Sequence, residues 1–95
     1  MFLGRYDYDG NPDVLLPAYD RLMAAMPPGQ VTFHICIRRD GGISIYDACP
    51  SAEVFASFST NPDVLAEMAA AGLPEPTVTP LGDSHHAEAA AGFVS

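Results

Sequence analysis

The sequence predicts an α+β fold in which one antiparallel sheet carries helices on a single face. Apolar and polar residues alternate over 30–39, and a second apolar run over 43–47 follows a glycine-rich turn, which indicates a β-hairpin. Apolar residues recur at helical spacing on both sides of this hairpin, within 15–26 and 54–68. Such a sheet buries its apolar face against the helices that precede and follow the hairpin.

The first half of the chain is expected to form a strand, a helix and the hairpin. Residues 2–8 mix aromatic and polar side chains as a strand does, and a turn follows. The regular helix is placed at 17–26, because Pro17 is tolerated at the first helical position but would cost about 3 kcal/mol inside a helix. The strands of the hairpin then span 30–39 and 43–47.

The second half is expected to form two short helices, a strand and a tail. Ser51 is a suitable N-cap for the first helix, and the second runs from Pro62 to Ala71. The last strand, 77–81, is limited to a sheet edge by its proline, and residues 87–95 form an apolar tail. With the two short helices taken together, the order strand–helix–strand–strand–helix–strand is that of a ferredoxin-like fold.

One pentapeptide, Asn-Pro-Asp-Val-Leu, occurs at both 11–15 and 61–65. It indicates either an internal duplication or the repeated use of a common helix opener. The second interpretation rests on general preferences, because Asn caps helices and Pro is favoured at their first position.

Length, charge and cysteine content limit the classes of protein to which the chain can belong. A chain of 95 residues forms one domain, residues 1–95. Twelve acidic residues against four arginines give a net charge of −8, so neither nucleic acid nor an anionic membrane is expected as a partner. The sequence has no membrane-length apolar stretch and no signal-peptide pattern, and we therefore expect its two cysteines to be free thiols in the cytoplasm.

The loop length of the hairpin decides which side chains share a face. A two-residue loop would place Ile43 and Ile45 beside His34 and Cys36. A three-residue loop over 40–42 instead gathers the aliphatic residues of both strands on one face, and this register is favoured because a slip of one residue turns a whole apolar set outward. The helices would then cover Val31, Phe33, Ile35, Ile37, Ile43 and Ile45, and the opposite face would carry Thr32, His34, Cys36, Arg38, Ser44 and Tyr46.

That opposite face is expected to need a cover. It combines a thiol and an aromatic ring with polar groups, whereas a sheet face open to water would be richer in Lys, Glu and Ser. A chain of this length has no second layer of its own, so a second copy of the same sheet is the simplest cover. We expect a homodimer in which two sheets pack face to face as a barrel.

Three stretches carry a resemblance to a known superfamily. They are Phe33-His34-Ile35, the segment from Ile45-Tyr46-Asp47 through Ser51-Ala52-Glu53-Val54-Phe55 to Phe58, and Ala71-Gly72-Leu73-Pro74-Glu75-Pro76, which span most of residues 30–82. In these stretches and in its order of elements, the chain resembles the dimeric α/β-barrel superfamily. This superfamily includes the antibiotic-biosynthesis-monooxygenase-like proteins and small actinobacterial proteins of unassigned function. Members oxidise aromatic polyketides without a cofactor, isomerise lactones, degrade haem or have no known reaction. His34 is the only candidate catalytic residue that the resemblance implies for this chain.

His34 and Tyr46 are the candidate catalytic residues. An imidazole inside the barrel could act as a general base, and the alternative is a structural histidine bonded within the dimer. The Tyr46 hydroxyl could donate to a carbonyl or enolate oxygen, or simply be an interior aromatic. Arg38 could bind a carboxylate or phenolate, unless it is a solvated charge. The candidate ligand-binding residues are Thr32, Cys36, Arg38 and His86.

Neither a metal nor a cofactor is expected. His85 and His86 are adjacent, so in an extended segment they point opposite ways, and they lack metal-ligand spacing. Residues 7–18 alternate acids like a calcium loop, but Pro12 and Ala18 occupy the positions that require Gly and Glu. Phosphate-binding glycine motifs and a serine elbow are missing from the sequence.

Three functions remain open from the sequence. The chain could be a cofactor-independent enzyme of monooxygenase or isomerase type, in which His34 removes a proton from a small aromatic or polyketide-like molecule in the barrel interior. It could bind such a molecule without turnover, or it could be a structural dimer whose interior is filled by its own side chains. A cavity of ligand size separates the third function from the first two.

Overall fold

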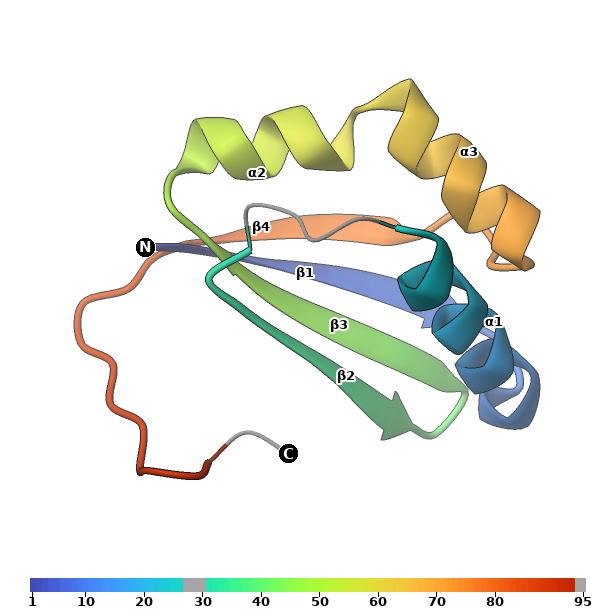
Figure 1. Cartoon of the computed structure of the whole chain (residues 1–95), viewed down its shortest axis with the longest axis horizontal. Helices are drawn as coiled ribbons and strands as arrows, with labels where there is room; N and C mark the ends of the chain where they lie inside the picture. Colours follow the sequence, from blue (N-terminus) through green and yellow to red (C-terminus); the bar gives the residue numbers. More distant parts are fainter. Residues whose placement is uncertain (27–30, 94–95) are drawn as a thin grey trace.

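A four-stranded antiparallel sheet lies under a layer of helices in the computed structural model of the chain, which describes residues 1–26 and 31–93 (Figure 1). Figure 1 shows the helices on one side of the sheet, so the predicted ferredoxin-like α+β fold is confirmed. The strands are β1 (Phe2–Asp9), β2 (Phe33–Arg39), β3 (Gly42–Cys49) and β4 (Thr77–Asp83), in the spatial order β2-β3-β1-β4, and the helices are α1 (Pro12–Ala25), α2 (Ala52–Ser59) and α3 (Pro62–Ala71). The predicted start of the second strand at Gln30 and the last two residues of the predicted tail lie outside the described residues.

The two copies of the pentapeptide open helices in the same way. The side-chain oxygen of Asn11 accepts a hydrogen bond from the Asp13 backbone at 3.0 Å, and that of Asn61 accepts one from the Asp63 backbone at 2.9 Å. Each places a proline in the first turn, where its missing N–H has no cost. The interpretation as a repeated helix opener therefore accounts for both copies.

The predicted start of the first helix is wrong, because α1 begins at Pro12 and contains Pro17. The cap at Asn11 starts the helix five residues before the predicted position. Leu15 and Leu22 are both buried, so starting the helix early buries an additional turn of apolar surface. Pro17 lies on the exposed side of α1, away from that packing.

The predicted register of the hairpin is also wrong. Arg39 pairs with Gly42, so the turn has two central residues, and Ile45 pairs with Cys36. The register is decided by β3, which lies inside the sheet and pairs with β1, where Tyr6 and Tyr8 face Ile45 and Ile43. The edge strand β2 then turns its aliphatic residues to the other side of the sheet.

The close approach of the strands at the turn also favours this pairing. A Cβ added to Gly42 would lie 2.0 Å from the backbone oxygen of Tyr8, so only glycine fits there. Gly41 in the turn has φ of +77°, a left-handed conformation that glycine adopts without strain. The consequence is that His34, Cys36 and Arg38 lie on the helix-covered face, and only Ser44 and Tyr46 remain on the open face as predicted.

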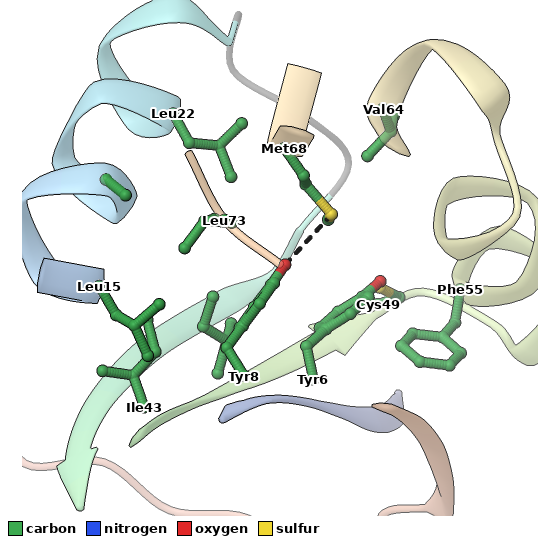
Figure 2. Close-up of a cluster of buried hydrophobic side chains, with 12 residues drawn as sticks. Tyr6, Tyr8, Leu15, Leu22, Ile43, Cys49, Phe55, Val64, Met68 and Leu73 are labelled. Carbon is green, nitrogen blue, oxygen red and sulfur yellow. Dashed lines mark hydrogen bonds between the residues drawn. The ribbon is translucent and has the colours of Figure 1, made fainter. Parts of the chain in front are cut away.

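The core lies between the helices and this face of the sheet (Figure 2). Phe55 of α2 packs on Tyr6 with ring centroids 5.7 Å apart, and Met68 of α3 packs on Tyr8. Each large apolar side chain buried here contributes about 1.5–3 kcal/mol relative to exposure. The buried cluster is made of Tyr6, Tyr8, Leu15, Ala18, Leu22, Ile43, Ile45, Cys49, Phe55, Val64, Met68 and Leu73.

Candidate active site

A cavity of about 350 Å³ opens between the helices and the sheet. Among the described residues, most of its wall is aliphatic, aromatic or thioether, and the ionisable groups in it are two tyrosines, one histidine and one aspartate. Its size lies within the range of small-molecule sites, about 300–1,000 Å³. The residues that line it are Tyr6, Tyr8, Leu22, Met23, Met26, Val31, His34, Ile45, Asp47, Phe58 and Met68.

His34 is held at the cavity wall by hydrogen bonds at both ring nitrogens. Its Nδ1 lies 2.5 Å from Asp47 Oδ1, and its Nε2 lies 2.5 Å from the hydroxyl of Tyr19, whose ring stacks on the imidazole. An ionised carboxylate only accepts hydrogen bonds, so Nδ1 carries the proton and donates to Asp47. Burial raises the pKa of Tyr19 to about 12, so its hydroxyl keeps its proton and can donate to Nε2 of the ring.

Asp47 is the site residue that sequence reasoning missed. Its side chain is 5% exposed, against 29% for His34, and it borders the cavity. Among the described residues, a hydrogen bond is made at Oδ1 only, which leaves Oδ2 available to a ligand. The signal was present in the sequence, because Asp47 falls in phase with Ile43 and Ile45 along the strand, where a charged residue is unexpected.

Of the predicted site residues, only His34 borders this cavity. Tyr46 lies on the opposite face of the sheet, so the prediction that these two residues share one interior is wrong. The physical reason is the two-residue turn, which reverses the phase of β3 relative to β2.

The four residues predicted to bind a ligand are dispersed. Thr32 is exposed, and Arg38 pairs with Asp13 at 2.8 Å in an exposed ion pair. His86 lies in the exposed tail beside Glu88. Cys36 is half-buried under the helices, where burial raises the pKa of its thiol, so it remains a protonated and weak nucleophile. None of the four lines the cavity, although Cys36 lies two residues from His34 on the same face of β2.

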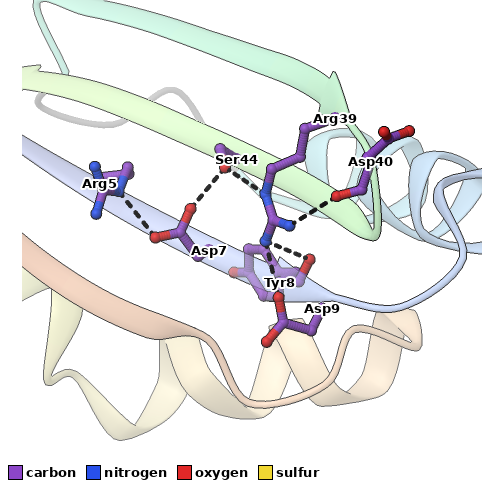
Figure 3. A network of polar contacts seen from close by, with 7 residues as sticks. All are labelled: Arg5, Asp7, Tyr8, Asp9, Arg39, Asp40 and Ser44. Carbon is purple, nitrogen blue, oxygen red and sulfur yellow. Dashed lines mark hydrogen bonds and ion pairs between the residues drawn. The ribbon is translucent and has the colours of Figure 1, made fainter.

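The open face of the sheet carries a second, shallower hollow with a network of charges (Figure 3). Asp7 accepts hydrogen bonds from Ser44 at 2.6 Å and from Arg5 at 2.8 Å, and Arg39 donates to Ser44 at 2.9 Å. The hydrogen bond from Ser44 and the charge of Arg5 lower the pKa of Asp7 despite its partial burial. These side chains satisfy one another, whereas Asp47 beside the other cavity has a partner at only one carboxylate oxygen among the described residues.

No protein-family model and no curated protein matches the sequence. One solved structure, a Deinococcus radiodurans protein assigned provisionally as an antibiotic biosynthesis monooxygenase, is similar with a TM-score of 0.65. The superposition covers 95% of this chain and 99% of the other at 9% sequence identity. This likeness shows a shared fold, and it agrees with the fold that the sequence resemblance implies.

Two further features of the described residues bear on function. No helix among them combines the length and the apolar character that crossing a membrane requires. Within residues 1–26 and 31–93, no three histidine, cysteine or acidic side chains come together as a metal site would need.

Proposed function

We propose that the cavity between helices and sheet binds a small aromatic molecule and that the His34–Asp47 pair removes a proton from it. The observation that carries this proposal is a hydrogen-bonded ionisable pair in the wall of an otherwise apolar cavity of about 350 Å³. Acid–base groups at such a position are typical of functional sites, because the surrounding apolar wall excludes water and strengthens their interactions.

The size and lining of the cavity favour an aromatic ligand. A cavity of about 150 Å³ in another protein holds benzene, so a volume of about 350 Å³ has room for roughly two fused rings. Met23, Met26 and Met68 supply three thioether side chains, which adapt to irregular shapes and make favourable contacts with aromatic rings. A small aromatic ketone or phenol fits both the volume and this lining.

The pair provides a path for the proton. Asp47, which borders the cavity, is fixed at Oδ1 by His34, while Tyr19 holds the imidazole from its other side. When a C–H bond of the ligand breaks, its proton passes to the pair and its electron pair remains on the ligand as a carbanion or enolate. Return of the proton to another carbon gives an isomer. Reaction with dioxygen places one oxygen atom on the carbon and releases the other as water, which balances the oxidation of a CH₂ group to a ketone.

Binding without turnover is the alternative, and one observation favours it. Both ring nitrogens of His34 already have partners in the free protein, so the imidazole itself can take up a proton only if the Tyr19 contact rearranges. The likeness in fold to a provisionally assigned monooxygenase supports the enzymatic proposal. The two functions share the cavity and differ only in whether a proton leaves the bound molecule.

Hydrogen exchange of a carbon acid separates the two functions. 2-Tetralone has two rings and acidic C–H bonds next to its carbonyl, and their exchange in anaerobic D₂O is followed by NMR. The wild type should accelerate this exchange, and His34→Ala or Asp47→Asn should lower the enzymatic rate by about 10²–10⁴-fold, the usual contribution of a general base. His86→Ala is the matched control, because that histidine lies in the exposed tail. Equal rates with the wild type and with buffer would rule out proton abstraction.

We further propose that the open face of the sheet pairs with the same face of a second copy. Ile35 and Ile37 are 39% and 40% exposed there, beside a hollow that carries both arginines and aspartates. A face with charges of both signs can complement itself across a two-fold axis. Phe93 of the tail stacks on Phe33 and yet remains 58% exposed, so the chain's own tail covers little of the face.

The test of this pairing uses two equally exposed aliphatic residues on opposite sides of the molecule. Ile37 on the open face is 40% exposed, and Leu65 on α3 is 38% exposed. Light scattering at micromolar concentration should give twice the chain mass for the wild type and Leu65→Glu, and the chain mass for Ile37→Glu. A monomeric wild type would refute the pairing, as would dissociation by both variants.

A further inference from the structure

Tyr6 carries a buried hydroxyl that has no hydrogen-bond partner among the described residues. Its side chain is 2% exposed and borders the cavity. Tyr8, two positions along the same strand, has a similar environment but donates its hydroxyl to the Met68 sulfur at 3.1 Å. Figure 2 shows this contact beside Tyr6, to which no hydrogen bond is drawn. Buried polar groups are nearly always paired, so the unpaired Tyr6 hydroxyl requires an explanation.

The surroundings of Tyr6 make its hydroxyl a donor. Burial, and then the negative charge of Asp47, raise the pKa of Tyr6 far above that of a free tyrosine, so the group keeps its proton. Tyr6 pairs across the sheet with Ile45, which is two residues from Asp47 on the same face. Tyr6 and Asp47 therefore border the same cavity from neighbouring strands.

We propose that the Tyr6 hydroxyl binds an oxygen acceptor of the ligand, so that the cavity selects small aromatic ketones over hydrocarbons of the same shape. This inference rests on the proposed function and names its substrate class. A carbonyl oxygen would give the orphan donor its missing partner, and an adjacent C–H would lie toward Asp47. When that C–H bond breaks, the proton goes to the His34–Asp47 pair and the electron pair moves to the carbonyl oxygen. The Tyr6 hydrogen bond then stabilises the enolate that forms.

A matched pair of probes and a matched pair of variants test this role. 2-Tetralone and tetralin share a two-ring skeleton, and only the first has a carbonyl oxygen. The wild type should bind 2-tetralone about tenfold more tightly than tetralin by calorimetric titration, because tetralin leaves the donor unpaired. Tyr6→Phe should bind both probes with equal affinity. Tyr46→Phe is the control and should keep the preference, since that hydroxyl lies on the opposite face of the sheet, away from the cavity.

The outcomes separate this inference from the proposed function. Equal binding of the two probes by the wild type, or a preference that persists in Tyr6→Phe, overturns the role of Tyr6 and leaves the cavity as a ligand site. Failure of the wild type to bind either probe overturns both. Tyr6→Phe removes only an unpaired atom, so its melting temperature should equal or exceed that of the wild type. The preference of the wild type for 2-tetralone over tetralin is measured without any variant, so this part of the test does not depend on how Tyr6→Phe folds.

Discussion

Removal of His34 should destabilise the protein more than removal of its partner. In His34→Leu the Asp47 carboxylate, 5% exposed, loses the hydrogen bond at Oδ1 and stays in an apolar wall. Breaking a fully buried pair costs about 3–5 kcal/mol. The side chain of His34 is 29% exposed, so water will partly reach the carboxylate once the imidazole is removed. We therefore expect the free energy of unfolding to fall by about 2–3 kcal/mol. Asp47→Leu leaves the His34 imidazole with its contact to Tyr19, so this change should cost about 1 kcal/mol.

The double variant, His34→Leu with Asp47→Leu, should recover most of the lost stability. Both polar partners are then replaced by apolar groups beside a cavity with room for them. We expect a total cost of about 1 kcal/mol and hence a coupling free energy of about 2–3 kcal/mol between the two positions. The assay is urea unfolding of the four proteins at pH 7, followed by circular dichroism. The dependence of the unfolding free energy on urea concentration should be the same for the four proteins, so that differences in the urea midpoint report differences in stability. Additive effects, with a coupling below about 0.5 kcal/mol, would refute the pairing of His34 with Asp47.

Three further perturbations follow from the packing and the charges. Gly4→Ala would place a Cβ 1.9 Å from the buried Phe55 ring and should lower stability by about 1–3 kcal/mol, measured as the thermal midpoint. Ser44→Ala removes the hydrogen bond that lowers the pKa of Asp7, so the free energy of unfolding at pH 7 should fall by about 1–2 kcal/mol. This loss should shrink as the pH falls through the Asp7 pKa, because the protonated carboxyl no longer depends on the hydrogen bond. A loss that is constant with pH would contradict this assignment. Burial, and secondarily Asp47, raise the pKa of the Cys49 thiol, so a thiol reagent should modify it only after unfolding in urea; rapid labelling of the native protein would show that it is accessible.

The sequence was sufficient for the fold because its local signals agreed with the global arrangement. Helical spacing, the Ser51 cap and the proline in β4 each specify one element or one boundary. The structure confirms these features, with Ser51 accepting from the Val54 backbone and β4 pairing at the sheet edge. Such signals depend on a few neighbouring residues, so they can be interpreted without knowledge of distant contacts.

The site could not be predicted fully because it depends on the order of strands in the sheet. Treating the aliphatic residues of β2 as core is reasonable for a central strand, but β2 is an edge strand. The large buried aromatic residues of the sheet are Tyr6 and Tyr8 of β1, which is one of the two central strands. The register that follows moves His34 under the helices and separates it from Tyr46. The residue itself was found from the sequence, whereas its partners Asp47 and Tyr19 come from segments whose proximity only the fold establishes.

The central claim is that ligands enter the cavity between helices and sheet, and the methionine methyl groups test it most directly. Met23, Met26 and Met68 line the cavity, and Met1, the remaining methionine of the four in the chain, is exposed at the N-terminus. Titration of protein labelled with ¹³C at the methionine methyls should shift the three cavity signals on addition of 2-tetralone and leave Met1 unchanged. Three unmoved cavity signals at saturating 2-tetralone would contradict the account.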